Sequence, residues 1–419
     1  MRKLSLIFVV LSIANVLNSQ TLTLDDCRTK AREHYPLIKQ FGLIDQSVQY
    51  NLNNANKAYL PQLSLSARAT YQSEVTKLPI TIPNITIPEL SKDQYQAAAE
   101  LTQVIWDGGA VVAQKKISRA GGEVEKQKLE VDLYAVNERI IQLYFGVLLL
   151  DEQLKQTKIL QDELATNYQR VMVYKQNGVA NQADADALKV EQLNALQREI
   201  ELKSTRKGYM DMLGAMIGEN LGEGAVLEKP ASIIPVANLE NRRPELGLFT
   251  AQNNFYESQK SLLSASVLPK VGLFLQGGVG KPALNMLSNS FSPYYIGGLR
   301  FSWTISNFYT QKDNKAKWDI SQKTSDVQKE TFLFNTELKS KQQQTEIEKL
   351  QQVIVNDDEI IRLRENIKKA ASAKVENGTM TITDLIREIN AENQSRQLKS
   401  LHEIQLLMSI YQLKNNINN

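Results

Sequence analysis

The chain has 419 residues, of which 42% are hydrophobic and 23% charged, and its formal net charge is +3. If a signal peptide removes Arg2 and Lys3, the mature chain carries about +1, which argues against nucleic acid as a partner. The only histidines, His34 and His402, are far apart in sequence and lack the spacing of metal ligands. No phosphate loop or catalytic nucleophile motif occurs. We therefore expect no enzyme activity, no cofactor and no metal.

The N-terminus is typical of a secretory signal peptide. Arg2 and Lys3 precede an apolar run, Leu4 to Val16, and Ser19 then lies in a short polar stretch. This run is too short for a transmembrane helix, so we expect cleavage after Ser19; a buried N-terminal strand is the alternative. The lone Cys27 is too far from the new end for a lipid anchor, and we expect it to be a buried thiol.

The first half of the mature chain predicts helix, two strands and a long helical hairpin. Residues 21–58 are amphipathic, with a break at Tyr35-Pro36. Residues 63–71 alternate between apolar and small or polar side chains, which is typical of a strand. A loop rich in proline and threonine follows. A second strand is expected at about residues 95–106, and Asp107-Gly108-Gly109 would turn it into the next helix.

Residues 109–177 contain no proline and predict one helix of roughly 100 Å. Seven apolar residues recur at alternating steps of three and four, which indicates a coiled-coil seam. They are Leu133, Val136, Ile140, Leu143, Val147, Leu150 and Leu154. A lone hairpin cannot bury such a seam, so we expect it to need partners. Asn177-Gly178 predicts a left-handed helix end, and a return helix should run from Asn181 to about Ile217.

After a proline-containing linker the pattern is repeated. Val267-Leu268-Pro269 repeats Tyr59-Leu60-Pro61, and two strands, a long helix ending at Asn377-Gly378 and a final helix follow. The glycine-rich Gly277–Gly280 is interpreted as an extracellular turn rather than a phosphate cradle. The expected organisation is a signal peptide (1–19), a first strand-strand-helix-helix repeat (20–217), a linker (218–245) and a second repeat with the C-terminal helix (246–419).

Four strands cannot close a barrel alone, since about eight are needed. Apart from the signal, the longest apolar run is too short to cross a bilayer as a helix, so a membrane-spanning part would have to be built from strands. In the fourth strand, Leu299 and Phe301 would then face lipid and Arg300 the interior. Four aromatic residues near strand ends suit an interfacial girdle: Trp106, Trp303, Tyr295 and Phe301. An aromatic-rich soluble sheet is the alternative.

The ordered set of these features resembles the TolC-type outer-membrane channel family. The segments that carry the resemblance are Leu22-Thr23-Leu24-Asp25-Asp26-Cys27, Tyr59-Leu60-Pro61-Gln62-Leu63, Trp106-Asp107-Gly108-Gly109 and the duplicated hairpin. The resemblance implies a mostly α fold with transmembrane β-strands, in which long coiled-coil helices form a periplasmic α-barrel continued by a β-barrel with four strands per protomer. It also implies a homotrimer in outer-membrane lipid that extends into the periplasm.

The implied function is a passive exit duct for efflux or export, working with a periplasmic adaptor and an inner-membrane pump. The resemblance places adaptor docking at the hairpin ends, at Asn177, Gly178, Asn377 and Gly378. It places the gate near the same ends, where Asp384 falls on the position of an acidic ring. The other gate candidates are Asp184, Arg387, which replaces a second carboxylate, and Met380, which replaces a bridging cation.

Other interpretations fit the sequence less well. Helix capping explains the tip residues too, because Asn181 and Thr381 are cap formers and the two aspartates would lie in the first helical turns. A periplasmic adaptor should have one hairpin flanked by small β-domains. A structural protein or adhesin explains the heptads but not the strands, and a hydrolase needs a catalytic constellation that is missing here.

Overall fold

The computed structural model describes residues 21–76, 90–222, 224–233 and 240–418. The expected signal peptide and most of the proline- and threonine-rich loop lie outside these ranges. The chain divides into two compact units. The first combines residues 1–38, 132–243 and 334–419, and the second combines residues 39–131 and 244–333. The two long helices contribute to both units, which are described one at a time below.

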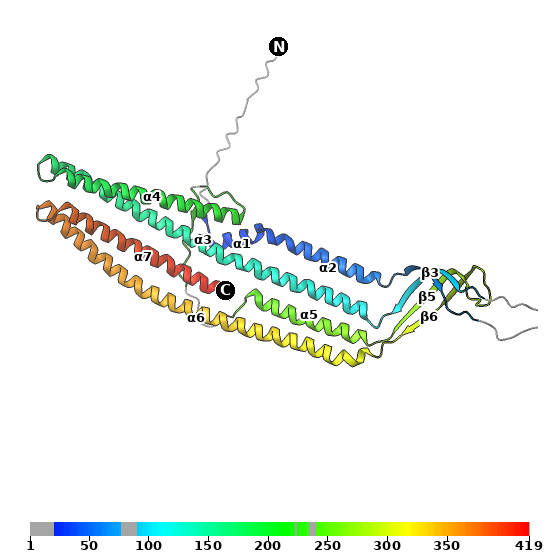
Figure 1. Ribbon diagram of the computed structural model, residues 1–419. Coiled ribbons are helices and arrows are strands. Elements are labelled where there is room, and N and C mark those ends of the chain that lie inside the picture. The colour runs from blue at the N-terminus through cyan, green and yellow to red at the C-terminus, as the bar shows by residue number, and fades with distance from the viewer. Residues whose placement is uncertain (1–20, 77–89, 223, 234–239, 419) are drawn as a thin grey trace, which may run out of the picture. The chain divides into compact units, whose positions relative to one another are not determined.

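The second unit contains an antiparallel sheet of four strands (Figure 1). The strands are β2 (Gln62–Tyr71), β3 (Asp93–Trp106), β5 (Lys270–Lys281) and β6 (Ser292–Ser302). Their order in the sheet is β2-β3-β5-β6, so β3 and β5 join the two repeats through pairs such as Leu101 opposite Leu275. The register shifts between Val104 and Trp106, a bulge at the end of β3. All four strands were predicted from the sequence.

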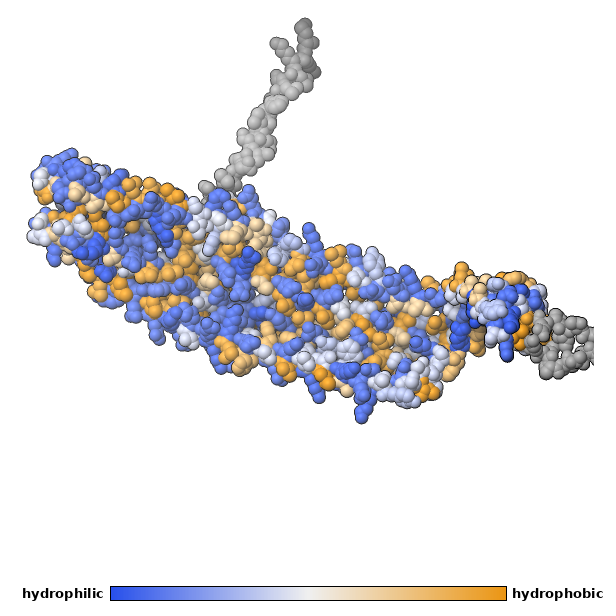
Figure 2. Space-filling model, viewed as in Figure 1, coloured by the Kyte–Doolittle hydropathy of each residue, from blue (hydrophilic) through white to orange (hydrophobic). Residues whose placement is uncertain are grey.

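The two faces of this sheet differ sharply in polarity. The register puts apolar side chains from all four strands on one face, and most of them are exposed: Leu63, Leu65, Tyr71, Tyr95, Leu101, Leu273, Leu275, Val279, Tyr295, Leu299 and Phe301. The opposite face holds Arg300, as expected, together with serine, threonine, glutamine and glycine residues. In Figure 2, hydrophobic and hydrophilic surfaces lie side by side on the strand segment.

The interpretation of Gly277–Gly280 as a turn is wrong, because all four residues lie within β5. Gly278 pairs with Ala98, and a Cβ on it would lie 2.4 Å from the carbonyl oxygen of Ala97. The glycine therefore permits a close approach between two strand backbones. A single sequence does not reveal the small residues of the partner strand that make this glycine necessary.

Four helical segments complete the second unit: α2 (Gln40–Lys57), α5 (Pro244–Ser266) and the first parts of α3 (Ala110–Gln176) and α6 (Asn307–Glu376). Lys126 on α3 pairs with Asp45 on α2 at 2.5 Å. In the second repeat, Lys260 on α5 pairs with Asp319 on α6 at 2.5 Å, so there the lysine lies on the shorter helix. An ion pair thus joins each long helix to a shorter one, with the charges reversed between the repeats.

The strand-to-helix turn before α3 is built around Asp107. Its carboxylate accepts hydrogen bonds from the backbone N–H groups of Gly109 (2.9 Å) and Val111 (2.6 Å) and from the Tyr59 hydroxyl (3.1 Å). Gly108 and Gly109 both have positive φ, at 72° and 85°. The acid thus caps the helix N-terminus, and the glycines permit the sharp reversal.

The first unit consists of α1 (Leu24–His34), α4 (Gln182–Ile217), α7 (Ile382–Ile417) and the remaining parts of α3 and α6. A two-stranded parallel sheet pairs β1 (Thr21–Leu22) with β4 (Val226–Leu227). Tyr144 of α3 binds this small sheet, because the tyrosine hydroxyl donates to the carbonyl oxygens of Leu22 (2.8 Å) and Glu228 (2.6 Å). The 3₁₀ turn Pro36–Lys39 follows α1.

Cys27 lies in the core of the first unit and is fully buried, as predicted. Burial raises the pKa of its thiol to about 12. The seam expected to need partners is largely satisfied within the chain. Six of its residues are buried: Leu133, Val136, Ile140, Leu143, Val147 and Leu150. Four of them pack in one cluster with residues of α1, α4 and α7. The expectation assumed an isolated hairpin and therefore missed these helices.

Other apolar stripes remain exposed on the first unit. Leu193, Leu196 and Ile200 form one on α4, and Ile360, Leu363 and Ile367 form another on α6. In each case the spacing of three and four puts the side chains on one helical face. These two surfaces, rather than the predicted seam of α3, are available to other chains.

Among the described residues, one helix, α3, is long and apolar enough to cross a membrane by length and composition. However, 61% of the qualifying stretch is buried within the chain. Its apolar residues are needed for the core of the first unit. Composition therefore does not identify α3 as a transmembrane segment.

Candidate functional site: the hairpin tips and their charged support

The two helical hairpins end in the same backbone turn. Gly178 and Gly378 have φ values of 77° and 68°, so the predicted left-handed conformation is confirmed at both tips. The N–H of Val179 donates to the Tyr174 carbonyl at 2.8 Å, and Thr379 donates to Lys374 at 2.9 Å. Asn177 and Asn377, the residues before the glycines, are exposed. Both turns thus satisfy carbonyl groups at the helix ends and present polar residues to solvent.

Capping groups start each return helix. At the first tip, Asn181 and Asp184 form a capping box, in which each side chain accepts the other's backbone N–H at 3.0 Å. At the second tip, the Thr381 hydroxyl accepts from the Asp384 N–H at 3.1 Å and donates to the Asp384 carboxylate at 2.7 Å. Both aspartates therefore have a capping role within their own chain.

Asp384 and Arg387 form an ion pair, with Nη2 to Oδ1 at 2.5 Å. The Thr381 hydroxyl and then Arg387 lower the pKa of the Asp384 carboxyl. Within one chain, this effect is opposite to the rise that repulsion in an acidic ring would cause. Asp384 is thus charged and partly neutralised by a residue one helical turn away.

Met380 does not project freely from the tip. It packs on a core cluster to which all four hairpin helices contribute, and Ala180 packs on the same cluster from the first tip. Leu164 of α3, Leu188 of α4, Val375 of α6 and Ile389 of α7 are among its buried members. The two tips are therefore joined by hydrophobic packing as well as by their similar turns.

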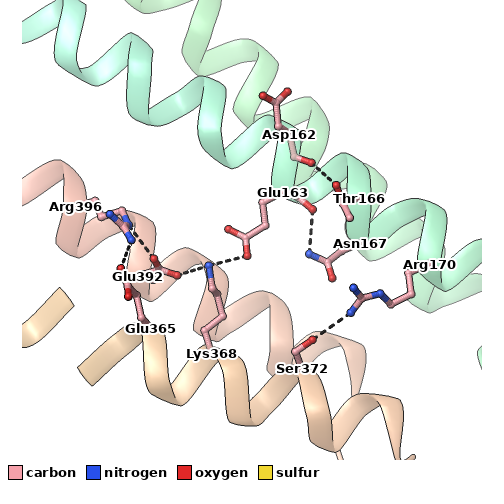
Figure 3. Close-up of polar contacts among 10 residues, drawn as sticks. All are labelled: Asp162, Glu163, Thr166, Asn167, Arg170, Glu365, Lys368, Ser372, Glu392 and Arg396. Carbon is pink, nitrogen blue, oxygen red and sulfur yellow. Dashed lines mark hydrogen bonds and ion pairs between the residues drawn. The ribbon is translucent and has the colours of Figure 1, made fainter. Parts of the chain in front are cut away.

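A charged network close to this core was not predicted from the sequence (Figure 3). The Lys368 ammonium of α6 lies between two carboxylates, 2.8 Å from Glu163 of α3 and in contact with Glu392 of α7. Arg396 binds the other oxygen of Glu392 at 2.8 Å and also contacts Glu365. The network therefore connects the first hairpin to both helices of the second.

Glu392 is the central acid of this network, and only 5% of its side chain is exposed. Burial would raise its pKa, yet the hydrogen bonds from Lys368 and Arg396 outweigh burial and hold the pKa below its ordinary value. For Lys368, burial acts in the opposite direction, and Glu163 and Glu392 outweigh it and raise the pKa. The groups thus stabilise one another as ions in a site that would otherwise disfavour charge.

One feature of the sequence indicates this network. Glu392 falls on the apolar stripe of α7, three residues after Ile389, where a hydrophobic residue would be expected. A second hairpin link lies closer to the turn, where Arg170 of α3 pairs with Glu376 of α6 at 2.9 Å. Polar contacts between the hairpins therefore recur along the tip region.

The described ranges contain no group of three or more His, Cys, Asp or Glu side chains able to hold a metal ion. The largest of the described pockets, about 540 Å³, lies at the other end of α4 and includes Arg206 and Lys207. The pocket is remote in sequence from the tip residues of either hairpin. Its Arg206 pairs with Asp151 at 2.5 Å.

Comparison with known proteins identifies the architecture. Residues 28–219 match the family model described as "Outer membrane efflux protein". Comparison with curated protein sequences gave no significant match. Among solved structures, the outer-membrane channel OprN is similar over 94% of this chain and 89% of its own, at 13% identity and a TM-score of 0.68. CusC is similar over 94% of this chain and 91% of its own, at 13% identity and a TM-score of 0.69.

The outer membrane protein VceC of Vibrio cholerae is similar over 94% of this chain and 96% of its own, at 12% identity and a TM-score of 0.65. These likenesses establish the fold. The combination of long helical hairpins and strands in each repeat is that of outer-membrane channels whose barrels are part helical and part β. The predicted resemblance is therefore confirmed: residues 28–219 are similar to the outer membrane efflux proteins, and the chain has the fold of TolC-type channels.

Proposed function

We propose that this protein is a trimeric outer-membrane exit duct for efflux or export, working passively with a periplasmic adaptor and an inner-membrane pump. After removal of the signal peptide, the strands would span the outer membrane and the hairpins would extend into the periplasm. The observation that carries the proposal is the open four-stranded sheet, which has two free edges and one apolar face.

The edges of the sheet favour closure with other copies. β2 and β6 are the outer strands, and each has one side without a partner strand within the described chain. Because every pairing in the sheet is antiparallel, β6 of one copy would run antiparallel to β2 of the next. Closure removes edges that cannot be left open in lipid. The number three comes from the TolC-type resemblance.

The exposed surfaces support the same assembly. The apolar sheet face, which includes Leu65, Tyr71, Tyr295 and Leu299, suits contact with lipid hydrocarbon. The α4 stripe (Leu193, Leu196 and Ile200) and the α6 stripe (Ile360, Leu363 and Ile367) would pack against neighbouring copies in the helical barrel. The aromatic residues near strand ends would lie at the membrane interface, including Trp303, whose indole N–H donates to the Val267 carbonyl at 2.9 Å.

In this duct the hairpin tips would be the inner end. Asn177, Gly178, Asn377 and Gly378 would form the docking surface for the adaptor. Three copies of Asp384 would approach one axis and form the gate, with Arg387 reducing its charge. Asp184 would contribute acidity at the first tip, and Met380 would contribute packing instead of a bridging cation.

A periplasmic adaptor is the second candidate, since adaptors also contain coiled-coil hairpins. The present chain has two hairpins, each preceded by a strand pair, and its fold matches outer-membrane channels over 94% of its length. These features favour the duct.

Cross-linking of the sheet edges tests the proposal. In a Cys27→Ser background, Ser66→Cys on β2 would be combined in turn with Tyr294→Cys, Ile296→Cys or Gly298→Cys on β6. All four positions lie on the polar face. One combination should oxidise to covalent dimers and trimers but nothing larger, whereas single-cysteine variants should give no trimer. Absence of a covalent trimer from every combination in the folded protein would contradict the closed ring.

A further inference from the structure

The polar face of the sheet is more basic than the rest of the chain leads one to expect. Its charged residues in the described strands are Arg68, Glu100, Lys270 and Arg300, three cations and one acid. Arg300 is committed to Glu100, with Nη2 to Oε1 at 2.8 Å, and its guanidinium lies 4.8 Å from the centre of the Phe274 ring. Arg68 donates to the Gln96 side-chain oxygen at 3.3 Å and has no ion pair with another described residue. The face therefore carries uncompensated positive charge.

A pocket of about 420 Å³ lies on this face where the strands meet the helices of the second unit. Lys270 and Arg300 both line it. The register places Lys270 opposite Ser302 and Arg300 opposite Gly272, so the two cations are diagonal neighbours on adjacent strands. Gly272 has no side chain to fill the space, and a Cβ there would lie 2.9 Å from the Gln103 carbonyl oxygen.

The acid that lines the pocket is not in an ion pair with Lys270. Asp107 is a carboxylate whose two oxygens accept the N–H groups of Gly109 and Val111 and the Tyr59 hydroxyl. Glu100 is paired with Arg300. Among the described residues, Lys270 therefore has no carboxylate in an ion pair with it. A pocket lined by a lysine, an arginine, Thr102 and Ser302 is suited to an anion.

We propose that this pocket binds the carboxylate or phosphate group of a small anionic solute, with Lys270 as the main charged contact and Arg300 as the second. The inference rests on the proposed function, because the polar face lines a lumen only when several copies close the barrel. The site would then slow and select anions in the strand section, at a place distinct from the acidic tips.

Citrate is a suitable probe, and its binding to the detergent-solubilised full-length protein can be measured by calorimetry at fixed ionic strength. Lys270→Gln should weaken binding roughly tenfold, since one charge-assisted hydrogen bond is lost. Lys270→Arg should retain most of the affinity. Arg68→Gln is the matched control because it removes a cation from the same face, roughly 30 Å along the strands and beyond the screening length. It should change the affinity by less than about twofold.

Failure of citrate to bind the folded wild-type protein would overturn the site. So would equal weakening by Lys270→Gln and Arg68→Gln, since it would show diffuse attraction instead of a pocket. A trimeric, pore-forming protein without citrate binding refutes this inference but not the proposed duct. A folded monomer that binds citrate through Lys270 refutes the duct but supports the pocket.

Discussion

The two hairpin tips have the same backbone and different chemistry. Each return helix has 36 residues and starts four residues after a left-handed glycine. Counted from the glycine, Lys368 and Glu392 of the second hairpin correspond to Tyr168 and Gln192 of the first. Gln192 is itself neutral; it donates to the Leu164 carbonyl at 3.3 Å and accepts from the Lys189 ammonium at 3.5 Å. The turn is therefore the same in both hairpins because each helix must end there. The side chains on the adjoining helices are under no such constraint and differ between the hairpins.

The divergence places the buried acid Glu392 and its two cations in the second hairpin. Arg387 and Arg396 correspond to Ala187 and Leu196 of the first hairpin, and Leu196 lies on the exposed apolar stripe of α4. The first hairpin thus offers an apolar surface where the second has an ion pair network.

Lys368→Met should destabilise the protein by about 3–5 kcal/mol, because it leaves Glu163 and Glu392 without their shared cation in a largely buried site. Urea unfolding of the detergent-solubilised protein would measure the loss. Lys369→Met is the matched control, since Lys369 is exposed, and it should have little effect. Adding Glu392→Leu to Lys368→Met should recover part of the loss; if the double variant is less stable than the single one, the two residues are not coupled as described.

Leu299→Arg should impair assembly, since a cation on the lipid-facing side of a barrel costs about 2–4 kcal/mol near the bilayer midplane. Leu299 is 72% exposed on the apolar sheet face. Ser302→Arg, on the polar face, is the control and should assemble nearly as well as wild type. The yield of trimers on semi-native gels gives the comparison. Equal wild-type yields from the two variants would mean that the faces are wrongly assigned.

Gly178→Val and Gly378→Val should each destabilise its turn by roughly 1–2 kcal/mol, because a β-branched residue is strained at positive φ. No atom lies within 4 Å of the added Cβ at either glycine, so the effect should be conformational and similar at the two tips. Binding of the adaptor should fall more than thermal stability. Unchanged adaptor binding and transport in the double variant would exclude these turns as the docking surface.

The network also predicts a pH dependence. The lowered pKa of Glu392 means that its contribution to stability is complete above the unfolded-state pKa and is lost as pH falls through the folded-state value. Lys368 remains protonated throughout this acidic range. Glu392→Gln should therefore flatten the acid side of the stability curve. If wild type and variant lose stability with the same slope in acid, Glu392 does not titrate as a paired carboxylate.

Asp384→Asn should have the smallest effect on stability, because its partner Arg387 is exposed. In planar bilayers it should nevertheless reduce cation selectivity and block by multivalent cations. Selectivity and block at wild-type levels, combined with a lower thermal midpoint, would show that Asp384 is only a helix cap.

The sequence predicts the elements of this fold closely, because their signals are local. Proline-free apolar periodicity, the Asn-Gly pairs and strand alternation identify both long helices, both turns and all four strands. Contacts between segments that are far apart in the chain could not be predicted from the sequence. The need for glycine at position 278 depends on Ala97 of the neighbouring strand. The burial of Ile140 depends on helices α1, α4 and α7.

The candidate site shows the same limit. The left-handed glycines and the capping residues were predicted, since each acts within its own turn. The network around Glu392 was missed because Glu163 is far away in sequence and lysines and glutamates on long helices usually face solvent. The roles of the tip residues in docking and gating remain predictions, because both depend on other chains.

The most direct test of the proposed duct is the mass of the folded protein in detergent, measured by light scattering with the detergent contribution subtracted. Free β2 and β6 edges and an exposed apolar sheet face predict a closed assembly of several chains, and the TolC-type resemblance predicts that the single species has three. A monodisperse monomer with the helical content of the native fold would contradict the shared barrel and, with it, the proposed duct.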